Sequence, residues 1–162
     1  HLIEQGYQRI AFIYGTTSAT GRQRHEGYVT AMATHGLETL TQAVPATVEA
    51  ARAAAGELTR GRPLPEALVG SNGLILLGLV EALRAAQLQF PEQIALAGFD
   101  DLPWTRLVGS GITVIAQPTY DIGQAAIELL LQRIAHSSQS VRRVVLRGEL
   151  RERGSSMRRS MK

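Results

Sequence analysis

Short, mostly apolar runs alternate along the chain with longer segments in which apolar residues recur at helical spacing. The short runs are expected strands, and they span residues 9–15, 39–44, 67–69, 94–97 and 112–116. The longer segments are expected helices, and they span residues 22–35, 46–60, 74–86 and 121–134. Strands that are apolar on both sides are typical of parallel sheets whose two faces are covered by helices. The pattern therefore predicts an α/β fold, a three-layer parallel sheet with helices on both faces.

Cap and turn residues set the limits of these elements. Ser18 or Thr20 is expected to cap the first helix, and Thr119 the last. Residues 1–6 resemble the final turn of a helix that ends at Gly6. The chain is therefore expected to be the carboxyl-terminal part of a longer polypeptide.

The helix expected at residues 121–134 has a broad apolar stripe. The stripe consists of Ile122, Ala125, Ala126, Leu129, Leu130 and Ile134, widened by Ile127 and Leu131. A helix of this kind needs a large surface to bury it. Residues 141–147, with the sequence VRRVVLR, are expected to form a further strand that continues loosely to residue 152.

Composition narrows the class of protein. The 162 residues correspond to about one domain, and 44% of them are hydrophobic, which is enough for a globular core. No apolar stretch approaches the ~20 residues that a membrane helix needs. The chain has no cysteine, so it has neither disulfides nor thiolate metal sites.

Positive charge is concentrated at the carboxyl end. Residues 141–162 contain eight of the 17 basic residues and two of the 14 acidic ones, so the rest of the chain is mildly acidic. A basic tail can contact nucleic acid through its phosphates. Here no aromatic residue is interleaved to stack on bases, which favours a solvated terminus. Residues 153–162 are therefore expected to be a basic disordered tail.

Polar residues that follow the expected strands are candidates for ligand binding. Asn72 and Asp100 each lie just past the carboxyl end of an apolar run, which is where open α/β sheets bind small molecules. Asn72 is either a helix cap or a ligand contact, because its amide can both donate and accept. Asp100 and Asp101 leave a strand end in different directions, so one is expected to face a cleft and the other to hold a turn. Arg24 lies near a helix start, where an arginine either is solvated or meets a polar ligand.

Enzyme motifs are missing from the sequence. No nucleophile elbow follows a strand, and Ser110, between two glycines, has the wrong spacing for one. His25, His35 and His136 lack the spacing of metal ligands, and no glycine loop has the pattern that cradles phosphates. We therefore expect no catalytic residue, no metal and no cofactor.

Four ordered segments resemble the regulatory domain of LacI/GalR-type bacterial transcription repressors. They read HLIEQGYQRIAFI, RHEGYVTAM, SNGLILLGLVEALRAAQLQFPEQIALAGFDD and TVIAQPTYDIGQAAIELLLQRI. This family is similar to periplasmic binding proteins of type I, in which two α/β lobes clamp a small molecule. The resemblance covers residues 1–152 and implies mostly the second lobe, with residues 118–136 and the neighbouring strand returning toward a first lobe.

The resemblance also implies which residues act. Arg24, Asn72 and Asp100 match the family's effector contacts, while Thr20 in a loop and Gln117 at the crossover lie where further contacts occur. Helix 74–86 and loop 103–110 resemble subunit-pairing surfaces, so the implied dimer interface comprises Leu74, Leu77, Val80, Trp104 and Leu107. The sequence departs from the family at Gly73, where aspartate is common, and in residues 39–45, which lack an aromatic that often stacks on the ligand.

The function implied by the resemblance is ligand-gated control of transcription. A homodimer in the cytoplasm would bind a sugar or related metabolite between its lobes and would contact operator DNA only through a headpiece that this chain lacks; no membrane is involved. Two alternatives stay open: a periplasmic-type solute-binding protein that serves a transporter, and a structural or swapped fragment that binds no ligand.

Overall fold

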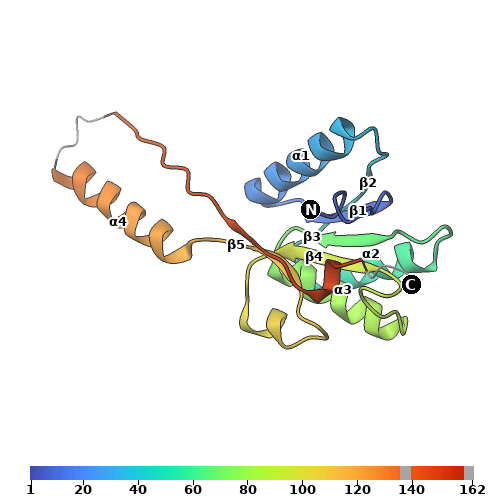
Figure 1. Ribbon diagram of the computed structural model, residues 1–162. Coiled ribbons are helices and arrows are strands. Elements are labelled where there is room, and N and C mark those ends of the chain that lie inside the picture. The colour runs from blue at the N-terminus through green and yellow to red at the C-terminus, as the bar shows by residue number, and fades with distance from the viewer. Residues whose placement is uncertain (136–139, 159–162) are drawn as a thin grey trace.

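A six-stranded sheet forms the centre of the computed structural model, which describes residues 1–135 and 140–158 (Figure 1). The strand order is β2-β1-β3-β4-β5-β6. Five strands run parallel: β1 (Ile10–Gly15), β2 (Leu40–Val44), β3 (Ala67–Gly70), β4 (Ala95–Phe99) and β5 (Thr113–Ala116). The sixth, β6 (Glu149–Arg151), is antiparallel to β5 at one edge. The predicted parallel sheet is confirmed for these five strands.

Helices cover both faces of the sheet, as the apolar runs predicted. Helix α1 (Ala19–Thr34) lies on one face, and α2 (Val48–Arg60) and α3 (Gly73–Ala85) lie on the other (Figure 1). Each helix begins at a side-chain cap: Ser18 accepts from the amide of Gly21, Thr47 from Ala50 and Asn72 from Ile75. These caps satisfy amides that a helix start leaves without partners.

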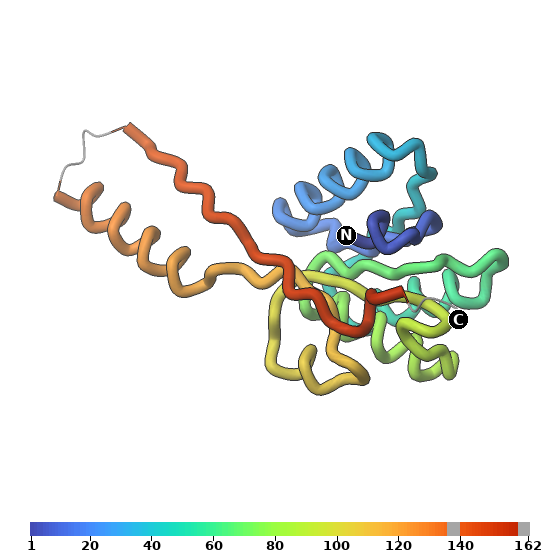
Figure 2. The backbone as a smooth tube through the Cα atoms, in the orientation of Figure 1, coloured from blue at the N-terminus to red at the C-terminus, as the bar shows by residue number. Residues whose placement is uncertain are grey.

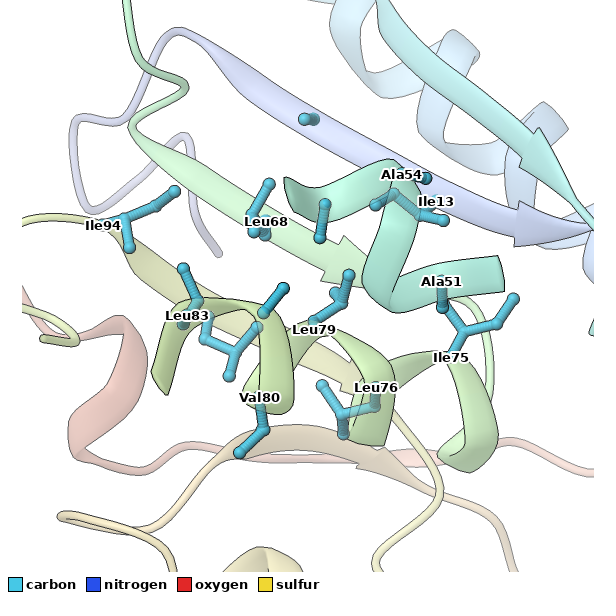
Figure 3. Packing of buried hydrophobic residues seen from close by; sticks show 14 of the residues in the cluster. Ile13, Ala51, Ala54, Leu68, Ile75, Leu76, Leu79, Val80, Leu83 and Ile94 are labelled. Carbon is cyan, nitrogen blue, oxygen red and sulfur yellow. The ribbon is translucent and has the colours of Figure 1, made fainter. Parts of the chain in front are cut away.

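The main core lies between α3, α2 and the sheet (Figure 3). Ile75, Leu76, Leu79 and Leu83 of α3 are fully buried, since the helical period turns all four toward the strands or α2. Helix α2 contributes small residues and therefore lies very close to α3. A Cβ added at Gly78 would lie 2.5 Å from the carbonyl oxygen of Val48, so only glycine fits there without a shift.

Helix α4 (Thr119–Ala135) leaves the sheet and projects away from it, and residues 140–148 run back toward the sheet (Figures 1 and 2). No residue of α4 is buried. Residues 140–148 form no strand, so the prediction of a strand at 141–147 is wrong. The physical reason is that these residues have no neighbouring strand to pair with, because pairing begins only where Glu149 reaches Ala116 of β5. Every helix in the described residues is too short or too polar to cross a membrane.

The carboxyl-terminal residues are ordered further than their charge suggested. Ser155 and Ser156 lie in a short 3-10 helix, η2 (Gly154–Ser156), and both are fully buried. Ser155 Oγ donates to the carbonyl oxygen of Leu96 over 2.5 Å and accepts from the amide of Thr113 over 2.9 Å. The predicted disordered tail is therefore wrong for residues 153–158, because these hydrogen bonds hold the segment against β4 and β5. Residues 159–162 lie outside the described residues.

The first six residues form one helical turn that ends at Gly6, as expected. Gly6 has a φ of 86°. Its amide donates to the carbonyl oxygen of Ile3, and the amide of Tyr7 donates to the carbonyl oxygen of Leu2. This is the glycine-terminated geometry by which helices commonly end. His1 Nε2 lies 2.8 Å from Ser156 Oγ, so this turn and η2 lie side by side.

Candidate functional site

The carboxyl ends of β3, β4 and β5 meet along one edge of the sheet, and most of the predicted effector contacts lie there. Asn72 follows β3, Asp100 follows β4 and Gln117 follows β5. Arg24 reaches the same edge from the second turn of α1. Parallel topology produces this convergence, because side chains at successive strand ends are neighbours.

Arg24 is held in one orientation by two contacts. Its Nη1 donates to the carbonyl oxygen of Ser71 over 2.6 Å, and its guanidinium carbon lies 4.3 Å from the centre of the Phe99 ring. Partial burial lowers the pKa of Arg24, and the neighbouring Asp100 carboxylate opposes this shift. The result is a fixed positive charge beside a negative one, with donors that can also meet a polar ligand.

Asp100 occupies an unusual backbone conformation, with a φ of 76°. Its Oδ2 accepts from the amide of Gly73 over 3.1 Å, and its Oδ1 accepts from Gln117 Nε2 over 2.5 Å. Each carboxylate oxygen thus has one donor and can accept another. Asp100 thereby links the start of α3 to the end of β5 and keeps acceptor capacity for ligand hydroxyls.

Asn72 is the cap of α3, as one of its two interpretations predicted. Its Oδ1 accepts from the amide of Ile75 over 2.9 Å. Its amide nitrogen makes no hydrogen bond with the described residues, and it carries two N–H donors. Capping therefore leaves Asn72 able to donate to a ligand at the same edge.

Gly73 follows the cap, at the position where the sequence resemblance led us to expect aspartate. A Cβ at this position would lie 2.5 Å from Leu102 Cδ1, so the leucine fills the space that a larger residue would need. The amide of Gly73 remains a donor to Asp100.

Thr20 does not lie in a loop, contrary to the prediction. It is the second residue of α1, is exposed, and its Oγ1 lies 2.7 Å from Ser18 Oγ. The helix begins three residues earlier than its apolar pattern indicated, because Ser18 takes the capping position.

Three of the candidate contacts, Arg24, Asn72 and Asp100, line two separate hollows. Arg24 lines one of about 450 Å³ beside α1, which is otherwise largely apolar and includes Tyr28 and Phe99. Asn72 and Asp100 line another of about 340 Å³ beside α3. The edge between them is an open surface with one wall, whereas small-molecule sites usually enclose most of the ligand.

The two adjacent aspartates have separate roles, as expected. Asp101 lies under the loop after β4 and accepts from Arg106 over 2.8 Å and from Arg153 over 2.6 Å. Hydrogen bonds from these two guanidinium groups lower the pKa of Asp101 to about 2. Asp100, in contrast, lies with its carboxylate among the carboxyl ends of β3, β4 and β5.

Sequence reasoning missed three residues of this region. Ser71 and Phe99 fix Arg24, and Arg153 fixes Asp101. Ser71 and Phe99 immediately precede Asn72 and Asp100. Their positions next to two predicted ligand contacts could have identified them from the sequence. Arg153 is distant in sequence and had no such signal.

The residues predicted to form a dimer interface fall into two groups. Leu74 and Leu107 are 54% and 83% exposed, and Leu77 and Trp104 are partly buried beside them. Val80 is only 4% exposed and belongs to the core, so its assignment to a surface is wrong. The period of α3 places Val80 on the same side as Leu76 and Leu83.

Within the described ranges, no group of three or more His, Asp or Glu side chains could hold a metal ion. His136 lies outside those ranges. Ser110 lies in an exposed loop, and among the described residues it has no histidine in hydrogen-bond contact.

A family model described as a periplasmic binding protein-like domain matches residues 1–156. The chain belongs to this family. More particularly, it is an effector-binding domain of the type found in LacI-family transcriptional regulators, as the following relatives show.

The curated relatives are regulators of transcription. The chain is 34% identical to the ribose operon repressor of Escherichia coli over 161 residues, which is 96% of this chain and 48% of that protein. It is 32% identical to the repressor PurR of Haemophilus influenzae, over 87% of this chain and 43% of that protein. The chain thus spans about half the length of these relatives. Their names favour a regulator over an enzyme.

Solved structures agree in fold. A complex of the transcriptional regulator CelR with cellobiose has a TM-score of 0.88 and 32% identity, over 95% of this chain and 48% of that one. A LacI-family regulator from Corynebacterium glutamicum has a TM-score of 0.82 and 30% identity, over 96% and 61%. A LacI-family regulator from Arthrobacter in complex with lactose has a TM-score of 0.82 and 25% identity, over 96% and 60%. Two of these relatives therefore hold disaccharides.

Proposed function

We propose that this chain senses a small sugar-like effector on behalf of a cytoplasmic LacI/GalR-type repressor. The observation that carries the proposal is the convergence of Arg24, Asp100 and Gln117 on one sheet edge. Charged and amide groups side by side suit a ligand whose hydroxyls both donate and accept. The disaccharides held by CelR and the Arthrobacter regulator support the same class of ligand.

The effector would bind between this lobe and a first lobe. The edge is open in this chain, so a second wall is needed to bury a small ligand. Helix α4 and residues 140–148, which leave the sheet with their apolar side chains exposed, are the segments proposed to reach that first lobe. The match to about half of each relative's length supports this arrangement.

Closure of two lobes on the effector would set the spacing of two DNA-binding headpieces. An effector shifts such an equilibrium only by the difference between its affinities for the two states, typically ~1–3 kcal/mol. The homodimer would pair through Leu74, Leu77, Trp104 and Leu107. The first three line one hollow beside α3, and Leu107 is exposed in the loop after β4. A monomer in light scattering at tens of micromolar would contradict this pairing.

Calorimetric titration of the complete polypeptide with ribose, cellobiose and lactose tests the function. We expect one of them to bind, and Arg24→Met and Asp100→Asn each to weaken binding at least tenfold, since a charge-assisted hydrogen bond contributes roughly 1.5–3 kcal/mol. Arg22→Met is the matched control on the same helix; Arg22 is exposed, and within the described residues its side chain donates to the carbonyl of Thr16. Undiminished binding by both site variants would show that the ligand lies elsewhere.

A further inference from the structure

The connection between β4 and β5, residues 100–112, begins at Asp100 and is fastened by a side chain that follows β6. That side chain is Arg153, which contacts the start, middle and end of the connection. We propose that Arg153 and Asp101 are positioning residues of the effector site, which hold Asp100 in the conformation that presents its carboxylate to the ligand. The proposal rests on the proposed function and adds two residues that do not touch the ligand.

Three hydrogen bonds carry the fastening. Arg153 Nη2 donates to Asp101 Oδ1 over 2.6 Å, and its Nη1 donates to Thr105 Oγ1 over 3.2 Å and to the carbonyl of Ile112 over 2.9 Å. The planar guanidinium fork makes these bonds at once, which the single ammonium of lysine cannot reproduce. The side chains of Arg153 and Asp101 are only 17% and 11% exposed, so solvent screens their attraction weakly.

Arg153 has a rigid base. Its amide donates to Thr113 Oγ1 over 2.8 Å, and Ser155 two residues later is fixed between β4 and β5. Its aliphatic stem packs on the backbone of Gly111, where a Cβ would lie 2.8 Å from Arg153 Cδ. Because the Arg153 backbone is fixed to β5, its guanidinium holds the connection in a fixed position relative to the strands.

Asp100 needs such support because of its backbone. A φ of 76° is unusual for a residue other than glycine, and such conformations persist where neighbouring structure fixes them. The amide of Asp100 bonds to the carbonyl of Ile115, and its own carbonyl accepts from Leu102. The hydrogen bond between Arg153 and Asp101 restrains the peptide that joins Asp100 to Asp101. Asp100 therefore cannot leave its positive-φ conformation without breaking that bond. Both Asp100 oxygens then stay directed at Gly73 and Gln117.

A purely structural role for Arg153 predicts a different result from a positioning role. If Arg153 only stabilises the fold, its loss weakens effector binding equally whether or not Asp100 is intact. If it acts through Asp100, its loss has no further effect once the carboxylate is gone. A double-mutant cycle separates the two, because only coupled residues deviate from additivity.

The test uses the complete polypeptide and whichever of ribose, cellobiose and lactose binds. Arg153→Met should weaken binding about tenfold, and less than about twofold in the Asp100→Asn background. The matched control is Arg151→Met, because Arg151 is exposed and, among the residues that the structure describes, its ion-pair partner is the exposed Glu149; the substitution should leave binding unchanged. Arg153→Lys keeps the charge without the fork and provides a second variant if the methionine variant fails to fold. Equal losses in both backgrounds would overturn the proposal.

Hydrogen exchange without any sugar gives a second readout. In Arg153→Met, amide exchange should accelerate at Asp100 and Gly73 but not in α2, which Arg153 does not contact. Unchanged exchange at Asp100 and Gly73 would overturn the positioning role. If the wild-type protein binds none of the sugars, the proposed function fails, and exchange alone decides whether Arg153 positions Asp100.

Discussion

Helices α3 and α4 are both rich in apolar residues, but α3 is largely buried and α4 is exposed. Four large side chains of α3 are fully buried against the sheet and α2. In α4 no residue is buried, and Leu131 is 60% exposed. Figure 1 shows α3 beneath the strands and α4 extended away from them. An apolar stripe thus indicates that a helix has a partner surface, but it does not say where that surface lies.

The difference follows from what each helix connects. Helix α3 joins β3 to β4, which are adjacent parallel strands, so the crossover places it back on the sheet. Helix α4 leaves from β5 and returns through residues 140–148 to β6, which pairs antiparallel with β5. No crossover constrains α4, and its stripe stays available for the first lobe proposed above.

The largest expected contrast is between two leucines. Leu79→Ala in α3 should lower the free energy of unfolding by about 2–5 kcal/mol, because Leu79 is fully buried and the substitution leaves a cavity. Leu131→Ala in α4 should change it by less than about 0.5 kcal/mol in this 162-residue chain. Urea unfolding of both variants measures the difference. A cost for Leu131→Ala that matches that of Leu79→Ala would mean that α4 is covered in solution.

A smaller contrast concerns how the free energy of unfolding depends on pH. The pKa of Asp101 is lowered to about 2 from 3.8 by Arg106 and Arg153, so folding favours its carboxylate form. Its contribution to the free energy of unfolding, at most about 2 kcal/mol, is complete above about pH 5 and is lost as the pH falls from about 4 to 2. Asp101→Asn should flatten that part of the stability profile, measured by urea unfolding between pH 6 and pH 3.

The matched control for the pH experiment is an exposed ion pair on the edge strand β6. Glu149→Gln removes the pair with Arg151, whose side chains are both more than half exposed, and such pairs contribute little. An equally flattened profile in this variant would show that the buried ion pair is not the cause.

The smallest contrast uses two helical glycines. Gly78→Ala should destabilise the chain by about 1 kcal/mol, because crowding against Val48 and Ala51 exceeds the gain in helix propensity. Gly123→Ala in α4 should instead stabilise that helix by up to about 1 kcal/mol, because nothing lies within 4 Å of the added Cβ. Thermal unfolding should therefore shift in opposite directions. Shifts of the same sign would show that packing at Gly78 is looser than described.

The fold was predictable because its signals are local. The central strands β1, β3 and β4 are apolar runs, and Ser18, Thr47 and Asn72 each lie next to the helix that they cap, so most of these elements follow from short stretches of sequence. The strand expected at 141–147 was wrong because pairing depends on a partner, and alternation or apolar content does not supply one. Val80 was misplaced because family resemblance assigned a surface that the helical period contradicts.

The candidate site was predictable only where strand ends define it. Asn72, Asp100 and Gln117 meet because β3, β4 and β5 are parallel neighbours. Arg153 could not be found, since its contact with Asp101 spans 52 residues and depends on a strand that sequence placed elsewhere. The serines of η2 were hidden for the same reason, within a stretch marked mainly by its charge.

The buried position of Ser155 has a consequence for biosynthesis. Leu96 and Thr113, which it joins, precede it by 59 and 42 residues. While the chain is being made, β4 and β5 emerge from the ribosome before the hydroxyl that bridges them. Until it arrives, a carbonyl and an amide at the heart of the sheet must stay hydrated. Residues 154–156 must therefore be synthesised before these two backbone groups can exchange water for the Ser155 hydroxyl.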